Sequence, residues 1–214
     1  MVVEKPQLKF EVNKDTELIV SALSGLLVIK GTDDNEASAS MEIKCPSTTG
    51  ECAAHFKNLE FETILRTDKV TIRPTKRLGY KGNRSSATVL YIPPVKHLIV
   101  RMNSGETRIS GVDAENISVS MKAGDMNIKI DKEITLLDCN LATGNVNVSI
   151  PEKIAGEVDI DSNVGEAVIK RGDIIENASR SLLVGAQSRR LISNKGTIVR
   201  ADVQVGDIEI NITK

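Results

Sequence analysis

Residues 100–148 read VRMNSGETRISGVDAENISVSMKAGDMNIKIDKEITLLDCNLATGNVNV. The segment contains Gly105, Gly124 and Gly144, which are separated by 19 and 20 residues. On both sides of each glycine, apolar residues alternate with polar ones, as in a strand with one buried face. Each unit therefore predicts two short strands joined through a tight bend, because glycine accepts the positive φ that other residues avoid.

The same register continues in both directions along the chain. A unit around Gly25 precedes the three, and units around Gly165 and Gly206 follow them. Gly165 lies 21 residues after Gly144, and Gly206 lies 41 residues after Gly165. The last gap therefore predicts two periods with one degenerate unit between them. The predicted turn glycines are Gly25, Gly105, Gly124, Gly144, Gly165 and Gly206.

The predicted degenerate unit lies between Gly172 and Gly196. Its apolar residues keep the register, but Arg189 and Arg190 occupy the region where the other units have their glycine. We expect a coil with a modified corner here. The two arginines then belong to a solvated turn or, as the alternative, form a local binding spot.

One unit cannot bury its own apolar face, whereas stacked units share a continuous core. The predicted fold class is therefore all-β: a single-stranded β-solenoid, or β-helix, with coils of about 20 residues. An apolar residue three positions before the glycine in most units predicts an interior ladder. Aromatic residues make up only 2% of the chain, so we expect a core of Ile, Val and Leu. The ladder residues are Met102, Met121, Leu141 and Val203.

The first 95 residues show a less regular pattern of longer alternating segments, at 37–44, 59–65, 69–74 and 87–94. Pro93 and Pro94 remove two backbone donors and are expected to end a strand. We therefore predict one continuous domain, 1–214, with an irregular β part at 1–95 and a regular repeat part at 96–214. The one helix candidate, at 50–59, is short and is expected to connect two strands.

A polar segment at 77–86 is the predicted surface loop of this region. It carries Arg77, Lys81 and Arg84. These side chains are expected to be solvated; the alternative is that they hold an anion or an acidic partner.

The three cysteines do not show the paired spacing of a zinc site. Cys45 and Cys52 flank a turn-rich segment, so they could close a small disulfide loop in an oxidising compartment or remain two free thiols. Cys139 falls on an inward repeat position and is expected to be a small core residue.

Charge is abundant but balanced, with 28 basic and 29 acidic residues. Such a chain has no single-signed field to attract nucleic acid, so no nucleic-acid partner is expected. The sequence contains no apolar run long enough to span a bilayer, and its N-terminus lacks a secretory signal. Membrane association is expected only through a segment outside this sequence, and the location is cytoplasmic if this N-terminus is native.

A polar, mostly acidic residue follows the turn glycine in each unit from Gly105 onward. Stacked coils would place neighbouring members about 4.8 Å apart, close enough for paired acid and base chemistry or for a cation. The alternative, which we favour, is that a tight turn prefers a polar residue after glycine. The residues of this acidic ladder are Glu106, Asp125, Asn145, Glu166 and Asp207.

Other catalytic arrangements are not indicated. His55 and His97 do not lie in a recognisable nucleophile motif, and no glycine-rich phosphate-binding loop is present. We therefore expect no enzyme activity, no cofactor and no metal.

The segment LYIPPVKHLIVRMNSGETRISGVDAENISVSMKAGDMNIKI, residues 90–130, resembles a bacterial β-strand-repeat family of candidate adhesins. The resemblance rests on Ile92-Pro93, on Ser104-Gly105-Glu106 and on Ala123-Gly124-Asp125. It implies a solenoidal β fold and often a place in the cell envelope, but no established activity.

The leading functional hypothesis is a non-catalytic structural or interaction module, an adhesin-like β-solenoid that binds a protein or a surface polysaccharide. Two alternatives remain open. One is a carbohydrate-active β-helix enzyme that uses the acidic ladder. The other is an assembly protein that associates end to end through uncapped solenoid ends.

Overall fold

The computed structural model describes residues 2–4, 6–45, 50–76, 85–177, 179–180 and 185–214. The helical elements within them are α1 (Gly50–Phe56) and the 3₁₀ turn η1 (Glu152–Ile154). The first nine strands are β1 (Val2–Glu4), β2 (Gln7–Phe10), β3 (Glu17–Gly31), β4 (Ala37–Lys44), β5 (Phe61–Arg66), β6 (Lys69–Pro74), β7 (Ser85–Ile92), β8 (Val95–Ser110) and β9 (Ala114–Lys129). The others are β10 (Leu136–Pro151), β11 (Ala155–Ser162), β12 (Ala167–Arg171), β13 (Ile174–Asn177), β14 (Ser179–Arg180), β15 (Ala186–Leu191), β16 (Thr197–Val205) and β17 (Ile208–Thr213).

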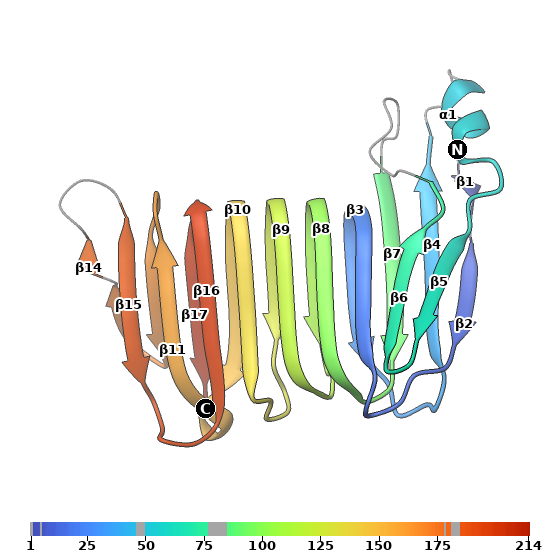
Figure 1. The fold of residues 1–214 in the computed structure, drawn as a ribbon. Helices are drawn as coiled ribbons and strands as arrows, with labels where there is room; N and C mark the ends of the chain where they lie inside the picture. Colours follow the sequence, from blue (N-terminus) through green and yellow to red (C-terminus); the bar gives the residue numbers. More distant parts are fainter. Residues whose placement is uncertain (1, 5, 46–49, 77–84, 178, 181–184) are drawn as a thin grey trace.

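Four of these strands, β3, β8, β9 and β10, are 15 or 16 residues long and bend sharply at a central glycine. Figure 1 shows each of them rising, turning over at the top edge and returning behind. The described strands form one hydrogen-bonded sheet of 17 strands, which these bends fold into two facing layers. Layer A comprises the halves before the glycines with β5, β6, β11, β15 and β16. Layer B comprises the halves after them with β2, β4, β7, β12, β13 and β17.

The core fills the space between the two layers, where inward residues alternate with outward ones along each strand. It is one cluster that runs from Phe10 to Ile212, and it contains few aromatic side chains. The predicted interior ladder of Met102, Met121, Leu141 and Val203 is confirmed, since each is at most 5% exposed. Cys139 is completely buried in the same core, and burial raises the pKa of its thiol.

The six predicted turn glycines stack in one column along the top edge. Backbone register pairs Gly25 with Gly105, Gly105 with Gly124 and Gly124 with Gly144. All six have a positive φ, between 93° and 149°. The column is too close for side chains, because a Cβ added at Gly105, Gly124, Gly144, Gly165 or Gly206 would lie 1.7 to 2.0 Å from the carbonyl oxygen of the next glycine.

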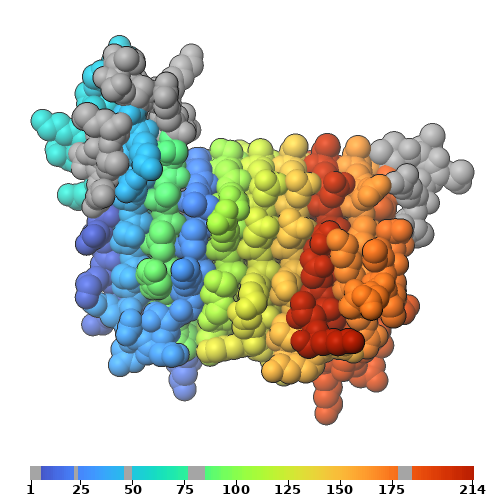
Figure 2. All heavy atoms as spheres, turned by 180° about the vertical axis from the view of Figure 1, so that it is seen from behind, coloured from blue at the N-terminus to red at the C-terminus, as the bar shows by residue number. Residues whose placement is uncertain are grey.

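The order of the units in space differs from their order in the chain. Strands β16 and β17 of the Gly206 unit pair in parallel with β10 on one side and with β11 and β12 on the other. In Figure 2 the red C-terminal segment accordingly lies between the yellow and the orange bands. The glycine column therefore runs Gly25, Gly105, Gly124, Gly144, Gly206, Gly165.

The predicted degenerate coil between Gly165 and Gly206 is wrong. Instead, β13 and β15 are antiparallel strands at the C-terminal end of the stack. Backbone register puts Glu176 opposite the buried Ile169 and Arg190 opposite the buried Val158, so both charged residues stand on inward positions. Such a segment is unsuited to an interior coil, where both flanking neighbours would desolvate its charges.

Both ends of the stack are covered by antiparallel strands. At the N-terminal end β5 covers layer A, while β4 and β2 cover layer B, with α1 beside them (Figure 1). At the C-terminal end the inward side chains Glu176 and Arg190 form an ion pair of 3.1 Å, here called the terminal ion pair. The end-to-end assembly considered above would need a parallel strand with a free edge at an end of the stack. In the described residues, antiparallel strands occupy both ends instead.

Candidate functional site

The acidic ladder is brought together by the stacking, along the top edge of layer B. Asn145 donates its Nδ2 and its backbone N–H to Oδ1 of Asp125, over 2.9 and 3.2 Å. The backbone N–H of Glu166 donates to Oδ1 of Asp207 over 2.8 Å. The N–H of Asp207 in turn donates to Oδ1 of Asn145 over 3.3 Å. Each of these acceptors stabilises the backbone just after the neighbouring glycine bend.

The first residue of the ladder is neutralised by a basic neighbour. Arg108 donates two hydrogen bonds to the carboxylate of Glu106, over 2.6 and 3.1 Å, and Asn127 donates a third. The Arg108 guanidinium lowers the pKa of Glu106 below its ordinary value. A carboxyl with a lowered pKa stays ionised and is a poor general acid. The ladder thus has the geometry of a turn-stabilising row.

The remaining predicted site residues do not converge. His55 lies on α1, whereas His97 lies on β8, where its Nδ1 is 2.9 Å from Nδ2 of Asn116. Arg189 pairs with Glu157 at 2.6 Å. Arg77, Lys81 and Arg84 lie outside the described residues. Among the described residues, no three His, Cys, Asp or Glu side chains are grouped as metal ligands, and no helix has the length and hydropathy of a membrane span.

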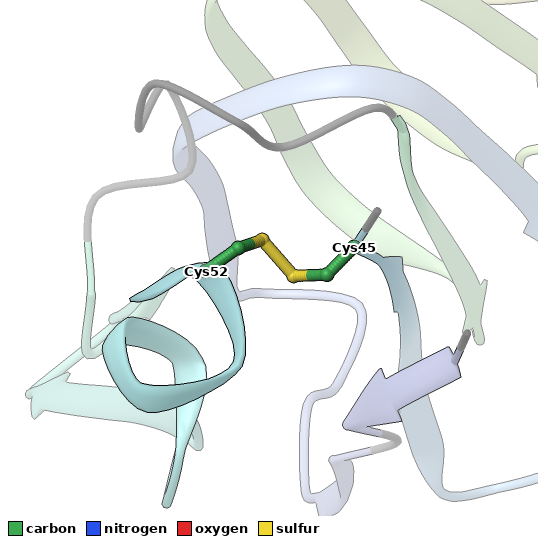
Figure 3. Close-up of a disulfide and its surroundings, with 2 residues drawn as sticks. All are labelled: Cys45 and Cys52. Atoms are coloured by element: carbon green, nitrogen blue, oxygen red, sulfur yellow. A yellow bond between two sulfur atoms is a disulfide. The ribbon is translucent and has the colours of Figure 1, made fainter. Parts of the chain in front are cut away.

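Cys45 and Cys52 are joined by a disulfide (Figure 3), with their Cα atoms 5.9 Å apart. The bond links Cys45, just after β4, to α1, and both cysteines are buried in the same core cluster as Phe56. It closes the short loop in which α1 begins. The short helix is thereby attached to the N-terminal end of the core.

Removal of this disulfide should lower the free energy of unfolding. Cys45→Ser combined with Cys52→Ser is expected to cost roughly 2–3 kcal/mol, because a cross-link over so short a loop restricts the unfolded chain only moderately. Urea denaturation with and without reductant measures the effect. Reductant should destabilise the parent protein and leave the double variant unchanged; equal stability of both proteins would contradict the prediction.

A shallow groove of about 630 Å³ crosses the outer face of layer A. Its lining comes from β3, β6, β8, β9, β10 and β16. The polar and charged residues among this lining are Ser21, Arg73, Arg101, Asn103, Ser120, Lys122, Asn140, Asp202 and Gln204. Several of them stand four positions before a turn glycine, as Arg101, Ser120 and Asn140 do. That shared position before the glycine is a sequence signal for the groove, although it matches no catalytic motif.

The outer face of layer B carries a smaller hollow of about 350 Å³. Its floor is rich in amide and hydroxyl groups, including Asn127, Asn147, Ser149 and Asn211. Nδ2 of Asn147 donates to Oδ1 of Asn127 across neighbouring strands, over 3.4 Å. Both outer faces are therefore broad polar sheets.

Comparison with one solved structure supports the fold, and a second structure is a more distant match. A candidate cell adhesion protein from Clostridium sporogenes superposes with a TM-score of 0.61 at 15% sequence identity, over 97% of this chain and 99% of that chain. A candidate adhesin from Bacteroides fragilis has a TM-score of 0.43 at 9% identity, over 97% of each chain. No protein of curated function matches the chain.

The family assignment comes from the sequence profile of the Toastrack DUF4097 family, which matches residues 11–211. The match takes in every strand from β3 to β16 and thus the whole glycine column. The expected membership in a β-strand-repeat family with adhesin-like relatives agrees with this result. The chain belongs to the Toastrack DUF4097 family.

Proposed function

We propose that this protein is a non-catalytic, adhesin-like interaction module that presents its two outer sheet faces to another macromolecule. The proposal is based on the fact that the residues of the acidic ladder already have hydrogen-bond or ion-pair partners within the protein. Asp125, Asn145 and Asp207 accept hydrogen bonds from neighbouring coils, and Glu106 pairs with Arg108. The polar groups that most resemble catalytic carboxylates therefore serve the bends. The two broad faces are left for contact with a partner.

The register supports the finer architecture that the sequence predicts. Gly105, Gly124 and Gly144 are direct neighbours in the column, which agrees with a solenoid coil of about 20 residues. The single continuous core supports one domain over 1–214. The strand order, with one unit inserted out of sequence, is compatible with a solenoid whose chain path is rearranged.

The disulfide supports a location in an oxidising compartment such as the cell envelope, since disulfides persist there and are rare in the cytosol. Thiol labelling of the native protein tests this part of the proposal. Cys45 and Cys52 should be protected from labelling until reductant is added, and free thiols at both positions in protein from cells would contradict it.

The non-catalytic assignment is tested with the variant Glu106→Gln combined with Asp125→Asn. Both substitutions keep an oxygen acceptor, so the bends should form and stability should change by less than about 1 kcal/mol. We expect the labelled parent protein to bind cell surfaces without cleaving their polysaccharides, and the variant to bind equally well. A polysaccharide-cleaving activity that the variant loses while it stays folded would overturn the proposal.

A further inference from the structure

Two basic side chains that line the groove of layer A have no acidic partner among the described residues. The side chains of Arg101 and Lys122 are exposed and make no hydrogen bond or ion pair with any residue that the structure describes. A third cation, Arg73, lines the groove while paired with Glu62 at 2.7 Å. The groove thus concentrates positive charge on a protein whose formal net charge is −1. An anionic ligand could pair with Arg101 and Lys122 without breaking an existing ion pair.

The groove has the shape of a site for a linear chain. Its lining extends across neighbouring strands in the order β6, β3, β8, β9, β10, β16. Five strand spacings correspond to a length of about 24 Å. Small outward residues, Ser21, Ser120 and Ala142, form part of its floor. A flexible polymer several units long fits such a channel better than a compact small molecule does.

The chemistry of the lining favours a polyhydroxylated occupant over a nucleic acid. The amides of Asn103, Asn140 and Gln204 can both donate to and accept from sugar hydroxyls. The described lining contains no aromatic residue on which a base could stack. Asp202 lies at the β16 end, where its carboxylate would repel phosphate but accept a hydrogen bond from a hydroxyl.

Asp202 also lies at the boundary between two kinds of surface. Its neighbours on layer A include Asp138 and Asp161, and burial together with these two carboxylates raises the pKa of Asp202. The positive part of the groove, from β6 to β9, thus gives way near β16 to a carboxylate, Asp202, that has Asp138 and Asp161 as neighbours. The charges of an occupant should therefore gather at the β6 to β9 end.

We propose that the groove of layer A binds a segment of a linear acidic polysaccharide, with Arg101 and Lys122 pairing with its carboxylate or sulfate groups and the amides holding its hydroxyls. This proposal rests on the interaction-module function given above and names the ligand class for one of the two faces.

The test measures binding of the full chain to four soluble probes by isothermal titration calorimetry: polygalacturonate, heparin, dextran and single-stranded poly(dT). We expect binding to polygalacturonate, heparin or both, weakening as salt is raised, and no binding to dextran. Polygalacturonate carries carboxylates alone and heparin carries sulfates as well, so tighter binding of polygalacturonate indicates carboxylate recognition, and binding of heparin alone indicates that sulfate is needed. Three outcomes would overturn the proposal. They are binding of poly(dT) more tightly than either acidic polysaccharide, binding of dextran as tightly as the acidic polysaccharides, and failure of both acidic polysaccharides to bind.

Variants then place the binding in the groove. Arg101→Ala combined with Lys122→Ala should lower the affinity by at least about tenfold, since two charge-assisted contacts are lost. Lys153→Ala removes an exposed charge from η1, outside the groove, and should change the affinity less than about twofold. Both substitution sets lie on exposed positions, so thermal unfolding should match that of the parent protein. Parent-like affinity in the double variant would overturn the proposal.

Cell-surface binding separates this proposal from the one it rests on. If the parent protein and the Arg101→Ala, Lys122→Ala variant bind cells equally well, the groove assignment fails while the interaction module stands. If the parent protein binds neither cells nor any probe, both fail. Selective loss of cell binding in the double variant, with the Lys153→Ala control unaffected, supports both.

Discussion

Gly144→Ala is expected to lower the free energy of unfolding by roughly 3–5 kcal/mol, the combined cost of a glycine-only backbone conformation and of overpacking. Gly144 has a φ of 129°, and a Cβ added there would lie 1.7 Å from the carbonyl oxygen of Gly124. The flexible end of a side chain could move aside, but this oxygen belongs to the backbone of a neighbouring coil. Equilibrium urea denaturation of the parent protein and the variant measures the difference.

The matched control is Gly50→Ala, at the start of α1, where an added Cβ would meet nothing within 4 Å. Its stability should stay within about 1 kcal/mol of the parent protein's, because alanine restricts the unfolded chain without a clash in the folded one. If both variants were equally stable, the close stacking of the glycine column would be refuted.

Removal of the terminal ion pair should increase the self-association of the protein above that of the parent. Glu176→Leu combined with Arg190→Leu replaces two inward charges by apolar side chains at the C-terminal end. Ile174, Ile175 and Leu191 are already 58 to 62% exposed on β13 and β15. The variant would therefore present a larger apolar patch on two edge strands, a surface that promotes pairing between chains. Sedimentation velocity over a range of protein concentrations measures the association.

A second pair on the same strand is the control for this experiment. Glu157 on β11 and Arg189 on β15 pair at 2.6 Å on outward positions, whereas the terminal ion pair joins β13 to β15 on inward positions. Glu157→Leu combined with Arg189→Leu also removes one acidic and one basic side chain, but from outward positions. This variant should associate less than the Glu176→Leu, Arg190→Leu variant does. A Glu176→Leu, Arg190→Leu variant that sediments like this control at every concentration would show that the terminal ion pair does not protect the end.

The bends and the inward residues could be predicted because both are local properties of the chain. A glycine at a positive φ and alternation with period two leave their mark within ten residues, as in VSMKAGDMNI at 119–128. The order of the coils is different. Every regular unit presents the same apolar and glycine pattern to its neighbours, so the pattern cannot tell whether Gly206 belongs beside Gly165 alone or between Gly144 and Gly165.

One signal for the correct order was present in the degenerate segment. Inward positions occupied by Glu176 and Arg190 are tolerated only where one neighbour is missing, at an end of the stack. The groove was hidden for a related reason. Ser21, Arg73 and Arg101 are far apart in the sequence and become neighbours only through the pairing of β3 with β6 and β8. Outward residues can be combined into a surface only after the strand order is known.

The out-of-sequence position of β16 and β17 also constrains how the protein is made. Synthesis proceeds from the N-terminus, and β3, β8, β9 and β10 can stack as they emerge because each finds its neighbour already present. Strands β11 and β12 emerge next, but the described structure pairs them in parallel with β16 and β17. Until residues 197–213 have been translated, one edge of β10 therefore has no partner strand. Strands β11 and β12 likewise lack the parallel neighbours that join them to the rest of the stack.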